Sequence, residues 1–265
     1  MELIPLFSGS SGNCTLVRTG STNILIDAGR NCKAIVTALT EVGTKPEDID
    51  AVFITHSHSD HVSGLDVFVR KYPTKLYATE QTFRSIKKLF RKPHLLTPDL
   101  VITPGEKVEA GDGISVICTP TPHDADGSVC YKILSGKKEI MIMTDVGYMT
   151  EQLKDFAKGV DGILIESNYD RRMLAYGDYP ESLKIRIAGD GGHLSNDDCA
   201  ETMKFLIDNG TRNFILGHLS ENNNTPEKAE TTVTEYLSSF GLTKGEDYFL
   251  RTAHRYCPTE AMVIE

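Results

Sequence analysis

The stretch Thr55-His56-Ser57-His58-Ser59-Asp60-His61 brings three imidazoles and a carboxylate together directly after the apolar run Ala51–Ile54. That run predicts a buried strand, so the four side chains lie on a loop that leaves a strand end. Imidazole and carboxylate are the groups that bind zinc, iron and manganese. His56 and His58 point the same way in an extended loop and can hold one metal, while the aspartate and third histidine are placed to hold a second. A polar surface loop is the weaker interpretation.

Further candidate ligands follow other predicted strands. They are Asp27 after Asn23–Ile26, His123 after Ile114–Cys118, Asp145 after Glu139–Met143, and His218 after Asn213–Leu216. Each alone is explained as a turn or capping residue. Because an α/β fold gathers its functional loops at strand ends, we expect these four residues to lie close to the histidine loop. Asp27 would orient a metal-binding side chain without binding the metal itself.

Strands and helices alternate along the whole chain of 265 residues, without repeat or linker, which predicts one domain over 1–265 with sheets covered by helices. Further strands are expected at Leu3–Phe7, Thr15–Arg18, Lys75–Ala78, Val129–Leu134, Gly162–Ile165 and Tyr248–Thr252, the second ending in a Thr19-Gly20-Ser21 turn. Helices are expected at Cys32–Glu41, Thr79–Lys92, Asn196–Asn209 and Pro226–Phe240.

Composition limits where the protein works and what it binds. No apolar run approaches the roughly 18 residues of a membrane span, and no secretory signal precedes the first strand. Six cysteines without a C-x-x-C pair are expected to be reduced, so we expect a cytoplasmic protein that binds no membrane. The net charge of −9 argues against a broadly basic DNA-coating protein.

One segment has the opposite charge. Arg70–His94 carries eight basic residues and a single acid, which leaves −16 for the rest of the chain. On a helix anchored by Phe83, Ile86, Leu89 and Phe90, several basic side chains would face solvent and could contact a phosphate backbone. They are Arg84, Lys87, Lys88, Arg91 and Lys92. A solvated helix face is the alternative.

The pattern H-x-H-x-D-H, with its later strand-end residues, resembles the metallo-β-lactamase superfamily from Asp27 to His218. The resemblance implies an α/β fold of four layers, an αββα sandwich with two divalent metal ions, zinc or manganese, at one edge. Carried over, His56, His58 and His123 bind one metal, Asp60, His61 and His218 bind the other, Asp145 bridges them and Asp27 buttresses the site. Only 73 positions separate Asp145 from His218, too few for a β-CASP insertion.

Details of the pattern favour phosphodiester hydrolysis. Two metals about 3.5–4 Å apart can hold a bridging hydroxide as nucleophile. Position 145 is Asp rather than the Cys of many β-lactamases, and position 58 is His rather than the Glu of the diiron flavoproteins. Glu166 and His193 resemble the pair that acts on the scissile phosphate in tRNA-processing members. His193 would then donate a proton to the leaving oxygen, and Asp60 and Asp27 complete the catalytic set. A histidine that only bonds the helix end is the alternative.

The segments Ser8–Cys14, Gly192–Asn196 and Gly217–Asn223 resemble the YycJ/WalJ-type subfamily, which implies a 5′→3′ exonuclease on double-stranded DNA. Asn13 and its loop would present N–H groups to a phosphate, although a tight turn explains the loop equally well. Two alternatives remain: a hydrolase of small phosphodiesters, thioesters or lactones, and a metal-bound interaction module without turnover. Metal identity, protein partners and the roles of His94 and His254 are left open.

Overall fold

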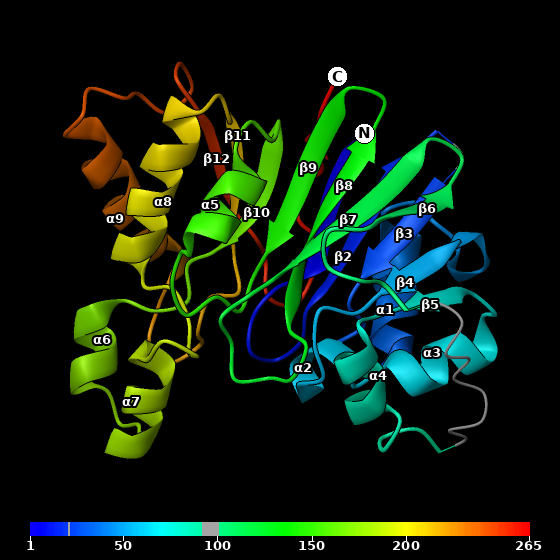
Figure 1. The fold of residues 1–265 in the computed structure, drawn as a ribbon. Helices are drawn as coiled ribbons and strands as arrows, with labels where there is room; N and C mark the ends of the chain where they lie inside the picture. The colour runs from blue at the N-terminus through cyan, green and yellow to red at the C-terminus, as the bar shows by residue number, and fades with distance from the viewer. Residues whose placement is uncertain (21, 92–100) are drawn as a thin grey trace.

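Two β-sheets pack face to face in the computed structural model, which describes residues 1–20, 22–91 and 101–265 (Figure 1). The first sheet has the order β13 (Met262–Val263), β1 (Glu2–Phe7), β2 (Cys14–Thr19), β3 (Thr22–Ile26), β4 (Ala51–Phe53), β5 (Lys75–Tyr77). The second has the order β12 (Phe249–Thr252), β11 (Asn213–Gly217), β10 (Gly162–Glu166), β9 (Lys138–Met143), β8 (Val129–Ser135), β7 (Ile114–Pro120), β6 (Lys107–Gly111).

Helices cover the outer face of each sheet, so the predicted αββα sandwich is confirmed (Figure 1). The first sheet is covered by α1 (Cys32–Glu41), α3 (Leu65–Lys71) and α4 (Glu80–Ile86), and the second by α5 (Glu151–Ala157), α8 (Asn196–Asp208) and α9 (Pro226–Ser238). The remaining helices are the short α2 (Ser59–Val62), a 3-10 turn (Pro46–Asp48), and the neighbours α6 (Arg171–Tyr176) and α7 (Glu181–Ala188).

Central strands carry apolar runs with side chains on both faces, such as Ile140–Met143, because both faces are buried there. In β9, Met141 and Met143 pack outward against the helices of the second sheet, whereas Ile140 and Ile142 point into the space between the sheets. This alternation is the period of two of an extended chain. The Tyr131 hydroxyl of the second sheet donates to the Ile54 carbonyl at 2.7 Å and so ties the two sheets together.

The strand directions bring the predicted site residues to one edge. β3, β4 and β5 are parallel, as are β9, β10, β11 and β12. β1 and β7 run in the same direction as β3 and β9, because two antiparallel pairings separate the members of each pair. The carboxyl ends of strands from both sheets therefore carry their loops to a common edge, as the sequence predicts.

Several boundaries differ from the prediction. The α4 helix ends at Ile86 instead of continuing to 92, and Leu89 is 59% exposed, so its expected anchoring role is wrong. The strands β6 and β13 and the helices α2, α3, α5, α6 and α7 were not predicted. Ser21, Lys92 and His94 lie outside the described residues. In the part of the chain that the structure describes, no helix is long and apolar enough to cross a membrane.

Candidate active site

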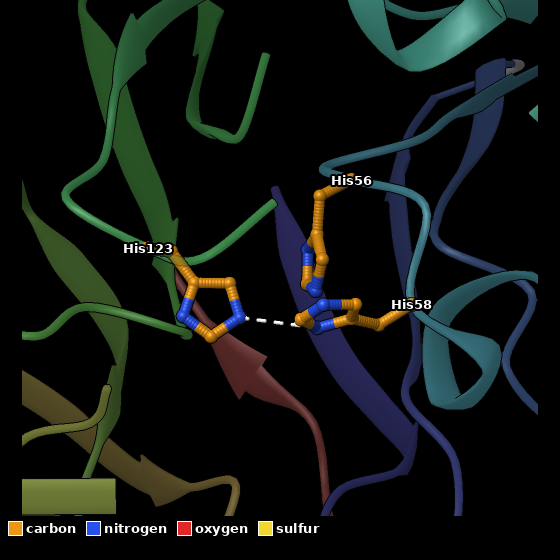
Figure 2. A group of neighbouring side chains, drawn as sticks. All are labelled: His56, His58 and His123. Atoms are coloured by element: carbon orange, nitrogen blue, oxygen red, sulfur yellow. Dashed lines mark hydrogen bonds between the residues drawn. The ribbon is translucent and has the colours of Figure 1, made fainter. Parts of the chain in front are cut away.

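Three histidines from two sheets form the first cluster (Figure 2). His56 and His58 lie on the loop after β4, and His123 lies on the loop after β7. Their nitrogen atoms lie within 4.8 Å of one another, and His123 Nε2 is 3.2 Å from His58 Nδ1. Three imidazole nitrogens converging in this way form an open face for one metal ion.

Hydrogen bonds fix which nitrogen faces the cluster in two of the three rings, His56 and His123. The Thr55 hydroxyl donates to the Asp27 carboxylate at 2.9 Å, so it accepts from Nδ1 of His56, 3.0 Å away. His123 Nδ1 donates to the Gly192 carbonyl at 3.1 Å. Both rings therefore present an unprotonated Nε2 to the cluster, which is the form that binds a metal.

The second cluster comprises Asp60, His61 and His218, and Asp145 contacts it from the loop after β9. Oδ2 of Asp60 lies 3.4 Å from His61 Nε2 and 3.5 Å from His218 Nε2. Asp145 Oδ2 lies 3.2 Å from His61 Nε2, and its Oδ1 lies 3.6 Å from Nε2 of His123 in the first cluster. Asp145 therefore lies between the two clusters, where the family resemblance leads us to expect a bridging ligand.

Asp27 lies directly behind the second cluster. Its Oδ2 accepts from Nδ1 of His61 at 2.7 Å, and its Oδ1 accepts from the Thr55 backbone N–H at 2.8 Å. The arrangement is the carboxylate–histidine pair that orients a ligand ring and raises its basicity. Thr55, which belongs to the histidine motif but has no predicted role, connects this carboxylate to His56 as well.

Three buried polar atoms of the clusters have no hydrogen-bond partner among the described residues: His56 Nε2, Asp145 Oδ2 and His218 Nδ1. A buried polar atom without a partner is costly, and native proteins rarely retain one without reason. The donor set of imidazoles and carboxylates fits divalent zinc or manganese. A cation at this edge would satisfy His56 Nε2 and Asp145 Oδ2, so the residues present fit a metal site. His218 Nδ1 instead faces Asp145 Oδ2 at 3.0 Å and Glu166 Oε1 at 3.2 Å.

Backbone strain is concentrated at the same place. Asp27, Asp145 and His218 have φ angles of 63°, 60° and 53°, and no other non-glycine residue of the described chain has a positive φ. Such a conformation costs about 1–3 kcal/mol and persists only where the surroundings enforce it. For His218 the enforcing contacts are the Ser8 hydroxyl, which accepts its N–H at 2.8 Å, and the Asn168 amide, which donates to its carbonyl.

Glu166, at the end of β10, holds His193 from a fully buried position. Its Oε1 lies 2.9 Å from His193 Nδ1, and its Oε2 accepts the backbone N–H groups of Val146 and Leu194 at 2.9 and 3.0 Å. His193 Nδ1 lies 3.7 Å from Asp145 Oδ1, and the His193 side chain is 16% exposed. The predicted pair therefore meets the metal-ligand candidates, and its histidine is reachable from solvent.

The electrostatic balance of the site favours cations. Burial alone would raise the pKa of Glu166, but His193 and His218 lower it to about 2. Burial likewise opposes ionisation of Asp145, yet the charges of His218 and His61 hold its pKa well below the usual range. Burial, reinforced by the neighbouring His61, lowers the pKa of His56. Burial would lower the pKa of His61 and of His218, but the charge of Asp145 raises both well above the ordinary value. A bound cation would therefore replace protons on these two rings, while the carboxylates are already ionised.

The predicted substrate-binding residues lie in two places. Asn13 is buried, and its amide nitrogen lies 3.0 Å from His61 Nε2 and 3.2 Å from Asp60 Oδ2. The basic residues lie on α4 and the turn after it. Arg84 pairs with Glu80, whereas Lys87, Lys88 and Arg91 are exposed. The first turn of α4 contacts the His123 loop, since the Thr79 hydroxyl donates to the Gly127 carbonyl at 2.9 Å.

Sequence reasoning missed Asp124, although it adjoins His123. Its Oδ1 lies 3.6 Å from Nε2 of both His58 and His123, and Arg186 of α7 holds its carboxylate at 2.5 and 3.0 Å. Burial would raise the pKa of Asp124, but the hydrogen bond from Arg186 lowers it. An acid next to a predicted ligand was the available signal, but its partner lies 62 positions away on a helix that was not predicted.

The fold and the histidine–aspartate clusters define a class of protein. A family model described as Metallo-beta-lactamase superfamily matches residues 8–218, so the chain belongs to this superfamily. It is a metal-dependent hydrolase of the superfamily and is homologous to exodeoxyribonucleases.

Particular relatives cover almost the whole chain. Exodeoxyribonuclease WalJ of Streptococcus pneumoniae serotype 2 is 37% identical over 243 residues, which cover 92% of this chain and 90% of the relative. Exodeoxyribonuclease YycJ of Bacillus anthracis is 33% identical over 259 residues, which cover 98% and 97%. Zn(2+)-bound PqqB from Methylobacterium extorquens shares the fold with a TM-score of 0.72 at 20% identity, covering 98% of this chain and 100% of that protein.

Proposed function

We propose that this protein is a two-metal phosphodiesterase that degrades double-stranded DNA as a 5′→3′ exonuclease in the cytoplasm. The observation that carries the proposal is the His193 imidazole, held by Glu166 beside Asp145 at the edge where the clusters meet. A phosphodiester leaves a poor alkoxide, which needs a positioned proton donor opposite the nucleophile. The similarity to exodeoxyribonucleases over nearly the whole chain supports DNA as the substrate.

The geometry supports a division of the ligands into two sets. His56, His58 and His123 would hold one divalent ion, and Asp60, His61 and His218 the other, with Asp145 between them. When bound, two such ions of zinc or manganese supply a nucleophilic water at neutral pH and stabilise charge on the attacked phosphoryl group.

The chain itself supplies orientation and a proton. Glu166 accepts from His193 Nδ1, and two backbone N–H groups hold its other oxygen in place. The imidazole is thereby fixed with Nε2 directed away from the carboxylate. A proton on Nε2 can pass to the departing oxygen as the P–O bond breaks. Asp27 and Thr55 keep His61 and His56 in the required tautomers.

End-labelled DNA duplexes incubated with metal-reconstituted protein test the proposal. Wild-type protein should release label from the 5′ end first, and Asp145→Asn should lower the rate by at least about 10³-fold because the clusters lose their shared charge. Bis(p-nitrophenyl) phosphate, a cyclic nucleotide and a thioester serve as competing substrates. Full activity of Asp145→Asn on DNA, or wild-type activity on the thioester alone, would contradict the proposal.

A further inference from the structure

The loop Ser8–Asn13, after β1, uses four of its six backbone N–H groups in hydrogen bonds within the protein. Gly9 N–H donates to the Asn13 side chain at 2.9 Å, Gly12 N–H to the Gly9 carbonyl at 2.9 Å, and Asn13 N–H to the Asp60 carbonyl at 2.7 Å. The Ser8 N–H donates to His254. A phosphate held mainly by backbone N–H groups of this loop is therefore not what the structure favours, and the side chains around the loop become the relevant groups.

Two arginines that belong to none of the sequence motifs pack against this loop. Arg30 follows β3, and its Nη1 donates to the Ser11 carbonyl at 3.0 Å. Arg255 follows β12, and its Nη2 donates to the Leu219 carbonyl at 2.7 Å. A Cβ atom added at Gly9 would lie 2.6 Å from Arg255 Nη1, and one added at Gly12 would lie 2.3 Å from Arg30 Cδ. A side chain at either glycine would therefore displace the neighbouring arginine.

One aromatic ring supports both guanidinium groups. The Cζ atoms of Arg30 and Arg255 lie 5.5 and 6.0 Å from the centroid of the Tyr256 ring. Arginine stacks on aromatic faces in this way and keeps its fork of donors in a fixed orientation. The Tyr256 hydroxyl donates to Glu221 at 2.9 Å, which holds the ring in turn. The two arginines are thus preorganised as a pair.

Three donors of this group have no partner among the residues that the structure describes. They are Arg30 Nε, Arg255 Nη1 and the Ser11 hydroxyl, all buried, and no carboxylate of the described chain forms an ion pair with either arginine. Both arginines and Ser11 are only partly buried, so an anion can approach two guanidinium groups whose charge no carboxylate of the described chain neutralises. Two guanidinium groups and a hydroxyl match the oxygen atoms of a phosphate.

The pair lies beside the metal-ligand candidates. The loop contacts them at both ends, because the Ser8 hydroxyl accepts the His218 N–H and the Asn13 amide lies 3.0 Å from His61 Nε2. The strands β1, β3 and β12, which precede the loop and the two arginines, all end at the edge that carries the site.

We propose that Arg30, Arg255 and Ser11 form a binding site for a phosphate group of the substrate strand, next to the phosphate that is cleaved. The identity of the ligand as nucleic acid rests on the proposed function. Either a 5′-terminal phosphate or an internal backbone phosphate has the required chemistry, and the choice of substrates distinguishes them.

Steady-state kinetics of Arg30→Gln, Arg255→Gln and Ser11→Ala test the site with a 5′-phosphorylated duplex, the same duplex with a 5′-hydroxyl, and bis(p-nitrophenyl) phosphate. Each arginine variant should raise KM for DNA by about 10- to 100-fold, and Ser11→Ala by a smaller factor, with little change on the small diester. Arg30→Lys should lie between wild type and Arg30→Gln, since it keeps the charge but loses the fork. A loss confined to the 5′-phosphorylated duplex assigns the terminal phosphate, and an equal loss on both duplexes assigns an internal one.

Arg212→Gln is the matched control, because this surface arginine also donates to one backbone carbonyl but precedes β11, at the opposite end of the strand from His218. An unchanged KM for DNA in the Arg30 and Arg255 variants, or an equal loss on the small diester, would overturn the inference.

Inorganic phosphate titrated into chelator-treated protein, followed by ³¹P NMR, separates this inference from the proposed function. Phosphate binding that Arg30→Gln abolishes, in a protein inactive on DNA, would contradict the proposed function and support the site.

Discussion

Asp27 follows β3 of the first sheet, and Glu166 ends β10 of the second. Each of these buried carboxylates contacts the Nδ1 atom of a histidine in nearly the same way. Asp27 accepts from His61 Nδ1 at 2.7 Å, and Glu166 lies 2.9 Å from His193 Nδ1. The surroundings of the two rings differ. The His61 ring is fully buried and its Nε2 faces Asp60 and Asp145, whereas His193 is 16% exposed.

The difference shows how the same carboxylate–histidine arrangement can serve two purposes. A ring whose second nitrogen is enclosed by carboxylates is suited to bind a cation, and the carboxylate behind it raises its basicity. A ring whose second nitrogen is open to the site is suited to carry a proton to substrate. Variants of the two pairs should therefore fail in different ways, the first through metal affinity and the second through the chemical step.

Among variants of the two carboxylate–histidine pairs, the largest effect is expected from His193→Ala. Removing a general acid lowers kcat by about 10²- to 10⁴-fold, while the bound metal content stays at the wild-type level. A substrate with a p-nitrophenolate leaving group needs less protonation, so the loss on bis(p-nitrophenyl) phosphate should be much smaller than on DNA. Parallel rate measurements with elemental analysis check both points. An equal loss on both substrates, or a loss of metal, would place His193 with the ligands.

A smaller effect is expected from Asp27→Asn. Asparagine tolerates the positive φ of this position and can still accept the His61 proton, so the fold should be retained. The neutral amide supports the ring less well, and metal affinity should fall by about 10- to 100-fold. Titration with a chelator measures the affinity, and excess metal should restore kcat. Glu166→Gln is the matched control: its activity should fall without recovery in excess metal.

Much of this comparison was visible in the sequence. The strands that lead to Asp27, Asp145, Glu166 and His218 each contain an apolar run of at least three residues, and parallel strands necessarily bring their ends to one edge. Local signals were also sufficient for α8, where Ser195 forms a capping box with Asp198. These features depend on neighbours in the chain, so a pattern can show them.

Features that depend on tertiary contacts were not visible. Helical periodicity continued beyond Ile86, yet the chain leaves the helix there and Leu89 is exposed, because tertiary context overrides local propensity. Arg30 and Arg255 meet at one tyrosine ring although 225 positions separate them. Only the placement of β1, β3 and β12 brings them together, and no spacing in the sequence encodes that placement.

The smallest effect is expected from the exposed basic residues after α4. They lie on the side of the site that the first sheet forms, and they belong to neither carboxylate–histidine pair. Charge reversal of Lys87, Lys88 and Arg91 should weaken DNA binding and flatten its salt dependence, by about one unit of log–log slope for each phosphate that the protein no longer neutralises. Metal content and turnover of bis(p-nitrophenyl) phosphate should not change. Lys137→Glu is the control, because Lys137 is exposed in the turn between β8 and β9, at the opposite end of β9 from Asp145. Because the helix ends at Ile86, these residues do not lie along one helix face, so we expect the log–log slope to change by less than about three units. An unchanged slope would show that these residues do not contact DNA.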